Sequence, residues 1–334
     1  MEDKLFMKRA IYLAHCADAD QVKGNPKVGA VLVCDDKIIG EGYHQKAGKA
    51  HAEVHCIKSV PRELRHLIPK STMYVTLEPC AHTGKTPSCA QMLAQLGLKK
   101  VVVGTLDPFP LVSGKGCEIL RSAGIEVSVG LLEQECKAIA KVFLTNQKYH
   151  RPFITIKWAE SADGFIDRKR SIEEKSAKIS TPFIQLLTHK MRGEHLGIMI
   201  GKCTYIMDHP NLTNRLYPLL PSPEVYILDN HLSLKDELKN HSHWNLISDS
   251  YSLNKVLNDM YQDGITSLLI EGGSKVIQSF INAGLWDEIR QEIGTIKLGN
   301  GTKAPQLPQT LTPTDTLHID GHTLLYYAKW HNSL

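Results

Sequence analysis

The sequence predicts an α/β protein of two domains, and three observations lead to that prediction. The chain has 334 residues, which suits two domains of ~100–200 residues each. In both halves, β-branched runs bounded by Gly, Pro and Asp alternate with helical patterns, as in α/β sandwiches. The segment 141–153, KVFLTNQKYHRPF, gathers polar residues and a proline just before a new apolar strand. We therefore expect one domain over residues 1–147 and a second over 148–334.

The first half opens with a charged amphipathic helix over about residues 2–18, with Leu5, Met7, Ile11 and Leu13 among its apolar positions. The β-branched runs that follow predict strands, and the segments between them predict helices. The expected elements are two strands within 30–44 joined by a turn at Asp35-Asp36, a helix from near His51, a strand over 72–79, a helix over Cys89–Leu96, a strand over 99–107, a helix over 116–123 and a strand over 125–130.

The second half alternates in the same way, although no internal repeat relates it to the first. The expected strands cover 153–161, 196–201, 224–229 and 267–273, and the expected helices cover 252–264 and 275–284. The segment 167–180, DRKRSIEEKSAKIS, alternates in charge. Such a pattern is typical of a solvated loop.

Charge and composition exclude several classes of protein. The 39 Lys and Arg residues against 35 Asp and Glu residues give a formal net charge of +4, which argues against a nucleic-acid-binding surface and an acidic disordered chain. No apolar run approaches the ~18–20 residues of a membrane span. The N-terminus, MEDKLFMKRAIYLAH, has no apolar signal core. We expect a cytoplasmic protein that acts on a small molecule, with neither nucleic acid nor membrane as a partner.

The eight cysteines are distributed unevenly, with seven of them in the first 136 residues. In a reducing compartment disulfides are not expected, and a cysteine is either a small buried apolar residue or a metal ligand. Cys80 and Cys89 have neighbours that favour the second role. We expect structural, buried roles for Cys16, Cys34, Cys117, Cys136 and Cys203.

The motif His51-Ala52-Glu53 is followed by Pro79-Cys80 and, nine positions on, by Cys89. One His and two Cys supply the three protein ligands of a catalytic zinc site, which keeps its fourth position for water. Zinc lowers the pKa of that water to ~7, and Glu53 is placed to move protons to and from it. This is the frame of zinc-dependent hydrolytic deaminases. We therefore predict His51, Cys80 and Cys89 as metal ligands and Glu53 as a catalytic residue.

Two other interpretations stay open from these residues. A structural zinc site, in a binding or regulatory protein, would close with a fourth ligand from His55 or Cys56. A nucleoside or nucleic-acid deaminase with an appended domain would share the same ligands, but the near-neutral charge and the long loop between the cysteines disfavour it.

The loop between the two cysteines carries a resemblance to a known family. It holds eight residues, in Cys80-Ala-His82-Thr-Gly84-Lys85-Thr86-Pro87-Ser-Cys89, where the deaminase signature usually has two. This pattern resembles the zinc loop of the bifunctional riboflavin-biosynthesis deaminase–reductase family, and Asn25-Pro26 and Tyr74–Cys80 agree with it. The resemblance covers essentially the whole chain. It implies a cytidine-deaminase-like α/β/α sandwich followed by a dihydrofolate-reductase-like α/β domain.

For the first domain, the resemblance implies hydrolysis of a diaminopyrimidine that carries a phosphoribosylamino group, giving a uracil and ammonia. Asn and Asp suit pyrimidine edges or hydroxyls, and His and Lys suit a phosphate. Phe109 stands where the family usually has Asn, which is a departure from the pattern. The residues implied for the substrate pocket are Asn25, His44, His82, Lys85 and Asp107.

The second half carries the motifs Lys157–Gly164 and Ser267–Ser274, and the latter is an apolar strand, two glycines and a helix start. Such a turn lets backbone N–H groups and the helix dipole approach an anion, although it is not the G-x-G-x-x-G fingerprint. The resemblance identifies this half as an NADPH-dependent reductase that converts the ribosyl group into ribityl.

The resemblance also assigns residues of the reductase half. Those implied for NADPH are Ala159, Lys178, Thr204, Asp208, Gly273, Ser274, Lys275, Val276, Ile277, Gln278 and Ser279. Those implied for the substrate are Ser176, Arg192, Leu212, Arg215 and Glu271. The two arginines suit bidentate phosphate binding, and Asp208 is a candidate proton relay.

Some positions of this half depart from the family pattern, namely Lys178, Gly197, Cys203 and His209. A deaminase with a weakened or cofactor-altered reductase half therefore stays an alternative. Self-association is common in the family, which points to a homodimer or a homotetramer.

Overall fold

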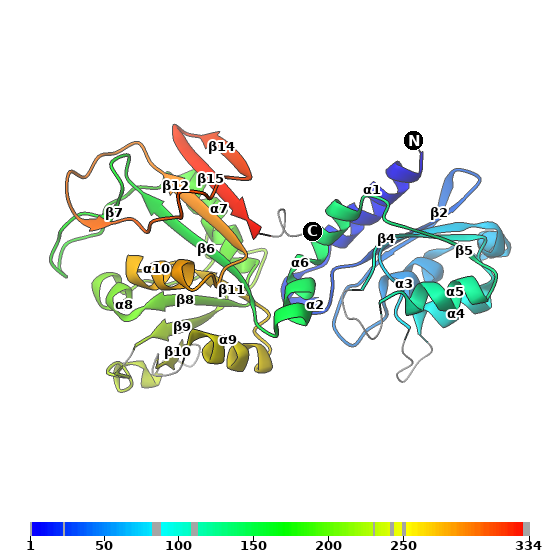
Figure 1. The fold of residues 1–334 in the computed structure, drawn as a ribbon, viewed down its shortest axis with the longest axis horizontal. Helices are drawn as coiled ribbons and strands as arrows, with labels where there is room; N and C mark the ends of the chain where they lie inside the picture. Colours follow the sequence, from blue (N-terminus) through cyan, green and yellow to red (C-terminus); the bar gives the residue numbers. More distant parts are fainter. Residues whose placement is uncertain are drawn as a thin grey trace. The chain divides into compact units, whose positions relative to one another are not determined.

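The computed structural model describes residues 2–22, 24–81, 88–107, 113–229, 231–240, 244–248 and 252–329. The chain divides into two compact units, Met1–His150 and Arg151–Leu334, which run from blue to green and from green to red in Figure 1. Each unit has its own sheet and its own hydrophobic core. The division falls three residues after the expected one at 147.

Unit 1 contains a five-stranded sheet in the order β2-β1-β3-β4-β5. Its strands are β1 (Gly29–Cys34), β2 (Lys37–Tyr43), β3 (Thr72–Leu77), β4 (Lys100–Thr105) and β5 (Glu126–Val129). β1 runs antiparallel to β2 and β3, whereas β3, β4 and β5 are parallel. Every residue of β1 is buried, as expected of a strand that is covered on both faces.

Helices cover both faces of this sheet. They are α1 (Glu2–His15), α2 (Ala19–Val22), α3 (Ala52–Ser59), the 3-10 helix η1 (Arg62–Lys70), α4 (Cys89–Leu96), α5 (Lys115–Ser122) and α6 (Glu133–Tyr149). Met7 of α1 packs with Val31 in one core, and Leu93 of α4 packs with Leu32 in another. Because successive strand residues point to opposite faces, these cores lie on opposite sides of the sheet. Unit 1 is therefore an α/β/α sandwich.

Unit 2 contains an eight-stranded sheet in the order β10-β9-β8-β11-β6-β12-β15-β14, and a small sheet of β13 and β7. The strands are β6 (Phe153–Glu160), β7 (Phe165–Asp167), β8 (Gly197–Gly201), β9 (Glu224–Leu228), β10 (Trp244–Ile247), β11 (Ser267–Ile270), β12 (Glu288–Ile293), β13 (Thr302–Lys303), β14 (Asp315–Ile319) and β15 (His322–Ala328). The large sheet is parallel from β10 to β12, and β15 and β14 continue it antiparallel.

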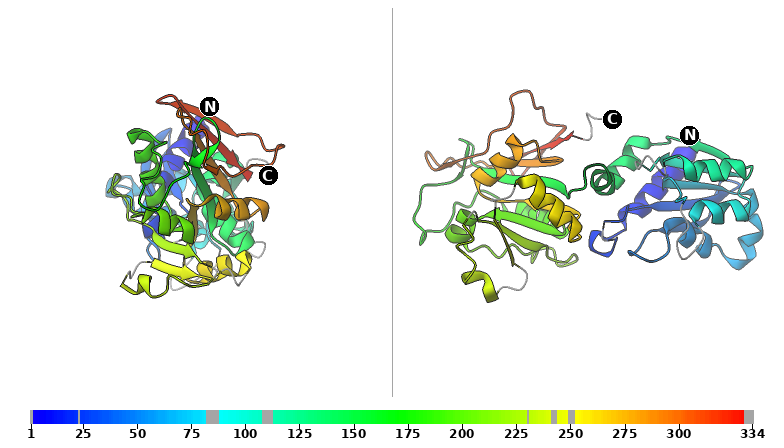
Figure 2. Two further views of the ribbon diagram at one scale, coloured as in Figure 1. Left: turned by 90° about the vertical axis from the view of Figure 1, so that its left-hand side faces the viewer. Right: turned by 60° about the horizontal axis from the view of Figure 1, so that its bottom comes forward.

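Two cores lie on opposite faces of the large sheet, and Figure 2 shows helices of this unit on both sides of its strands. The helices of unit 2 are α7 (Pro182–Gly193), α8 (Lys202–Asp208), the 3-10 helix η2 (Glu237–Asn240), α9 (Leu253–Gln262) and α10 (Ser274–Asn282). Leu257 of α9 and Phe280 of α10 pack with Leu268, whereas Tyr205 of α8 packs with Leu269. Ligands of open parallel sheets bind at the carboxyl ends of the strands, where α8 and α10 begin.

Several elements differ from the sequence-based expectation. α1 ends at His15, and Leu5 is 62% exposed, so that side chain adds nothing to the core. α6 continues to Tyr149, so the polar segment 141–153 is partly helical, because polar residues alone do not end a helix. α6, α7, α8, β7, β10 and the strands from β12 onward are among the elements that were not predicted. β12 buries charged residues such as Glu292, which conceals its strand pattern.

The cysteines expected to be structural fall into two groups. Cys34, Cys117 and Cys136 are buried, as predicted. Cys16 and Cys203 are exposed, so the expectation of burial was wrong for both. Cys16 follows the end of α1, and Cys203 lies in the first turn of α8 and lines a cavity.

Candidate active sites

Three elements of unit 1 bring the predicted metal ligands together. His51 directly precedes α3, Cys80 follows β3, and Cys89 is the first residue of α4. The Nδ1 atom of His51 lies 3.6 Å from the Cys80 Sγ and 3.3 Å from the Cys89 Sγ. The backbone N–H of Cys89 donates to the Cys80 Sγ at 3.2 Å. Ser88 and Gln91 form a capping box that fixes the start of α4.

This donor set fits a zinc ion. The three ligand atoms all lie within 4.8 Å of one another. Zn–S and Zn–N bonds of ~2.3 and ~2.05 Å at a tetrahedral angle place N and S about 3.6 Å apart, which agrees with the distances above. Hydrogen bonds from Cys89 and then His51 lower the pKa of the Cys80 thiol to about 4, and zinc binds the thiolate form. Among the described residues, neither His55 nor Cys56 joins this group.

Glu53 lies in the first turn of α3 and is only 3% exposed. Its burial raises the pKa of the carboxyl group to about 7. Glu53 stands two residues after His51, so it lies beside the group of metal ligands but is not one of them. The carboxyl group is thus held in a position from which it can exchange protons with a ligand at the metal.

Two of the predicted substrate residues lie next to this centre. The Asn25 Nδ2 atom is 3.4 Å from the His44 Nε2 atom, and the His44 Nδ1 atom is 3.2 Å from the carbonyl of Ala50. The His44 ring meets the His51 ring edge-on, with 5.6 Å between their centroids. Burial lowers the pKa of His44, which favours its neutral form. Asn25 and His44 therefore form one wall beside the metal ligands.

Of the other substrate residues predicted for this half, the structure describes only Asp107. Asp107 follows β4 and is half-buried, and its backbone N–H donates to Glu78. His82 and Lys85 lie outside the described residues, as does Phe109. Sequence reasoning assigned no role to Glu78, although it stands in the same run of residues as Cys80.

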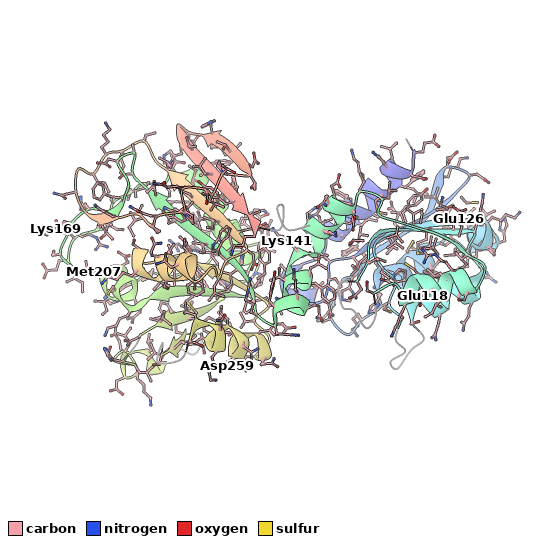
Figure 3. The ribbon with its side chains drawn as sticks, in the orientation of Figure 1. Glu118, Glu126, Lys141, Lys169, Met207 and Asp259 are labelled. Carbon is pink, nitrogen blue, oxygen red and sulfur yellow. The ribbon has the colours of Figure 1, made fainter. Side chains whose placement is uncertain are left out.

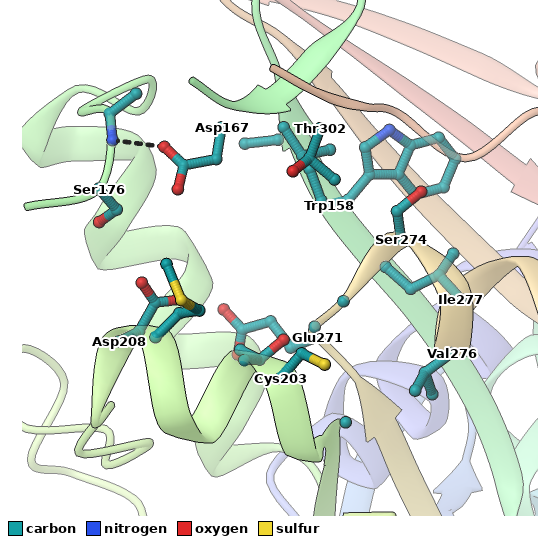
Figure 4. Close-up of a pocket in the computed structure, with 18 of the residues that line it drawn as sticks. Trp158, Asp167, Ser176, Cys203, Asp208, Glu271, Ser274, Val276, Ile277 and Thr302 are labelled. Carbon is teal, nitrogen blue, oxygen red and sulfur yellow. Dashed lines mark hydrogen bonds between the residues drawn. The ribbon is translucent and has the colours of Figure 1, made fainter. Parts of the chain in front are cut away.

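Unit 2 holds a cavity of about 1520 Å³ at the carboxyl ends of its parallel strands. Figure 4 shows Ser176 and Asp208 on one side of it and Ser274 and Ile277 on the other. Ligand sites commonly measure ~300–1,000 Å³, so this cavity has room for a dinucleotide and a second molecule. Lys169 and Met207, which are labelled in Figure 3, both line this cavity.

Most of the residues predicted for the reductase half line this cavity, but two do not. Leu212 is 4% exposed and belongs to the core around Ile198. Gln278 bonds to Asn282 and to the carbonyl of Gln306. The lining residues are Ala159, Ser176, Lys178, Arg192, Thr204, Asp208, Arg215, Glu271, Gly273, Ser274, Lys275, Val276, Ile277 and Ser279.

The two glycines before α10 form a backbone cradle. Gly273 is the N-cap of α10, has φ +68° and caps the helix without a side-chain hydrogen bond. A Cβ on Gly272 would come within 3.1 Å of the Thr204 side chain. The first N–H groups of a helix can bind a phosphate where no side chain intervenes. This cradle fits the pyrophosphate of a dinucleotide.

Charged side chains are buried together at the floor of the cavity. Arg192 donates two hydrogen bonds to the Glu271 carboxylate, at 2.7 and 2.8 Å. Both residues were predicted to bind substrate. In the structure, the guanidinium group of Arg192 is hydrogen-bonded to Glu271, so these N–H groups are not available to bind a phosphate. Lys157 lies 4.0 Å from the carboxylates of both Glu271 and Glu292. Burial lowers the pKa of Lys157, and sequence reasoning gave this residue no role.

The charged segment 167–180 is more ordered than its pattern suggested. Arg170 has a side chain that is only 3% exposed. It donates to Asp167 at 2.5 Å, to the carbonyl of Met207 at 3.0 Å and to the carboxylate of Asp208. The expectation of a solvated loop was therefore wrong around Arg170, because alternating charges can pair within the fold. Asp208, predicted as a proton relay, is tied to Arg170 at the end of α8.

Comparison with known proteins settles the family. The RibD C-terminal domain matches residues 152–324, and the cytidine and deoxycytidylate deaminase zinc-binding region matches residues 1–105. The riboflavin biosynthesis protein RibD of Aquifex aeolicus is 36% identical over 323 residues, which cover 90% of this chain and 88% of that protein. The chain belongs to the RibD family.

Solved RibD structures agree along the whole chain. The deaminase/reductase of Thermotoga maritima matches with a TM-score of 0.87 and 33% identity over 98% of both chains. A crystal form of Acinetobacter baumannii RibD matches with a TM-score of 0.81 and 31% identity, again over 98% of both chains. RibD of Bacillus amyloliquefaciens is 36% identical over 334 residues, covering 91% of this chain and 87% of that protein.

Membership of the RibD family confirms the predicted fold and the predicted class of activity. The chain combines a cytidine-deaminase-like zinc-binding domain with a reductase domain of the dihydrofolate-reductase-like fold, which uses NADPH. It is a bifunctional deaminase and reductase of riboflavin biosynthesis. Among the described residues, every helix is too short or too polar to span a membrane.

Proposed function

We propose that residues 1–147 of this chain deaminate 2,5-diamino-6-(5-phosphoribosylamino)pyrimidin-4-one. The observation that carries the proposal is the convergence of His51, Cys80 and Cys89 beside the buried Glu53. The division of the chain after His150 and the family matches to 1–105 and 152–324 support two separate activities. The first activity adds water to the pyrimidine and releases ammonia.

Each residue of the first site has a part in that reaction. His51, Cys80 and Cys89 would hold the zinc ion, which when bound would lower the pKa of a water molecule to about 7 by its Lewis acidity. Glu53 takes up a proton and delivers it to the departing amino group. Asn25 and His44 orient the pyrimidine, and Asp107, His82 and Lys85 complete the substrate contacts.

We further propose that residues 148–334 reduce the ribosyl group of the deaminated product to ribityl phosphate. The Gly272-Gly273 cradle would hold the pyrophosphate of NADPH, which would supply the hydride when bound. Arg215 lies exposed at the cavity and is placed to bind the substrate phosphate. The reduction also consumes one proton. We assign the buried Lys157, which lies beside Glu271, as the donor of that proton.

A coupled assay tests both halves at once. Purified protein, the diaminopyrimidine substrate and NADPH should give ammonia release followed by NADPH oxidation. The deaminated product supplied directly should be reduced without a lag. Accumulation of that product with no NADPH oxidation would contradict the second activity and favour the weakened-reductase alternative, which Lys178 and Cys203 on the cavity wall motivate.

Removal of zinc should separate the two activities. After dialysis against a strong chelator we expect deamination to be lost, because the zinc ion is the group that we assign to the activation of water. Reduction of the deaminated product should continue at its former rate, since the residues that line the unit 2 cavity all lie beyond residue 150. Re-addition of zinc, measured against metal content, should restore deamination. Equal loss of both activities would contradict the assignment.

Two finer points stay predictions. A homodimer or homotetramer is expected in solution, and sedimentation equilibrium of the purified chain would show it. A cytoplasmic location is expected, and fractionation of the source cells would show it.

A further inference from the structure

A buried carboxylate beside the metal ligands has no part in the proposed reaction. Glu78 follows β3, stands two residues before Cys80 and is 6% exposed. Its Oε2 atom accepts hydrogen bonds from the backbone N–H groups of Asp107 at 3.2 Å and Gly114 at 2.9 Å. Its Oε1 atom accepts from the N–H groups of Gly116 at 2.8 Å and Cys117 at 3.3 Å. All four donors are backbone groups, so this position requires a group that only accepts hydrogen bonds.

These donors belong to two segments that are distant from Glu78 in the sequence. Asp107 follows β4, whereas Gly114, Gly116 and Cys117 form the start of α5. The N-cap of α5 is Gly114, which has φ +83° and provides no side-chain cap. Glu78 supplies the missing cap from another strand, and a carboxylate at a helix N-terminus is favourable. Its own backbone N–H donates to the carbonyl of Thr105 at 2.9 Å.

The first turn of α5 also packs directly on the chain beside Glu78. A Cβ added to Gly116 would lie 2.0 Å from the carbonyl oxygen of Pro79 and 3.1 Å from the Oε1 atom of Glu78. The contact therefore requires glycine. The peptide that leads to Cys80 and the start of α5 form one tightly packed joint, and Glu78 is its centre.

We propose that Glu78 is a positioning residue for substrate binding, which holds Asp107 in register with the zinc ligands. The inference rests on the proposed deaminase, in which Asp107 contacts the substrate. Glu78 is not a catalytic residue, because its oxygens are engaged by backbone N–H groups and it is buried. Its loss should loosen Asp107 and α5 while His51, Glu53 and Cys89, which stand at the starts of α3 and α4, remain in place.

The test is Glu78→Gln. The amide keeps the shape of the side chain but turns an NH₂ group toward two backbone donors. A hydrogen bond to a charged acceptor accounts for roughly a tenfold change in equilibrium. We therefore expect the KM for deamination of the diaminopyrimidine to rise about tenfold or more, and kcat to stay within about threefold. Zinc content and reduction of the deaminated product should be unchanged.

A matched control separates positioning from general stability. Glu41→Gln removes another carboxylate of unit 1, which accepts from Arg9 at 2.6 and 2.8 Å between α1 and β2. This variant should lower the melting temperature without changing KM. Hydrogen exchange of the peptide that covers 105–117 should accelerate in Glu78→Gln and not in Glu41→Gln. Glu78→Asp keeps the carboxylate on a shorter side chain and should give an intermediate KM.

Three results would overturn the proposal. One is an unchanged KM in folded, zinc-loaded Glu78→Gln. Another is loss of zinc together with collapse of kcat, which would make Glu78 a support of the ligands themselves. The third is failure of both Glu78 variants to fold, which would make its role structural. Absence of deamination in the unaltered chain would instead refute the proposed function.

Discussion

Glu53→Gln is expected to abolish deamination and to leave zinc bound. The glutamine keeps the size of the side chain and removes the group that accepts and returns protons. Positioned acid–base groups contribute ~10²–10⁴-fold, and hydrolytic deamination needs Glu53 for more than one transfer, so we expect kcat to fall by about 10³-fold or more. The metal should stay, because the ligand group consists of His51, Cys80 and Cys89.

The measurement is ammonia release by the purified variant, with zinc content determined on the same sample. Reduction of the deaminated product provides the internal control, because its cavity is lined by residues of unit 2. Retained deamination in Glu53→Gln would refute the role of Glu53 in proton transfer. Loss of zinc would show that Glu53 supports the metal site instead of the chemistry.

Lys157→Met is expected to stop reduction by the same chain. Lys157 lines the cavity and faces Glu271 and Glu292 at 4.0 Å. Loss of a positioned proton donor should lower the reductase kcat by about 10²-fold or more, with deamination unchanged. NADPH oxidation with the deaminated product as substrate measures this effect.

The variant should fold, and the buried charges explain why. Three basic side chains, Lys157, Arg192 and Arg290, interact electrostatically with the carboxylate of Glu271, and Lys157 also with that of Glu292. Removal of one cation leaves two of each sign, and methionine fills a similar volume. A buried charge without a partner is costly. In this variant Glu271 keeps its two hydrogen bonds from Arg192, and Glu292 keeps its contacts with Ser180 and His322.

Asp208→Asn decides between the two candidate proton donors. The Asp208 carboxylate is paired with Arg170 at the end of α8. We expect the asparagine variant to weaken the hold on segment 167–180 and to change the reductase rate by less than about tenfold, the range of a partly exposed ion pair. A larger loss of reductase rate in Asp208→Asn than in Lys157→Met would identify Asp208 as the proton donor, as the sequence had predicted.

The zinc centre shows how far sequence alone can go. Few residue types bind zinc and few carry protons near neutrality, so His51, Glu53, Cys80 and Cys89 were recognisable from spacing. The strand–Gly–Gly–helix turn was recognisable for a similar reason, because close approach of backbone to an anion requires glycine. The α/β class followed from alternating hydrophobic patterns.

Other features depend on contacts between residues that are far apart in the chain. Leu212 and Gln278 were expected at the cavity, but Leu212 packs into a core and Gln278 bonds along the side of α10. The guanidinium group of Arg192 was expected to bind a phosphate, but it is hydrogen-bonded to Glu271, which is 79 residues away in the sequence. Which face of a helix meets which strand decides these partners, and a local pattern does not contain that information.

The sequence by itself determined the two α/β halves, the metal-ligand set and the glycine cradle, because each depends on residue types that few others can replace. The tertiary structure alone decided the pairing of Arg192 with Glu271, the burial of Lys157 and the four backbone donors on Glu78. Those donors lie 29 to 39 residues from Glu78. They meet it only because β3 and β4 are parallel neighbours, and α5 begins beside the end that they share.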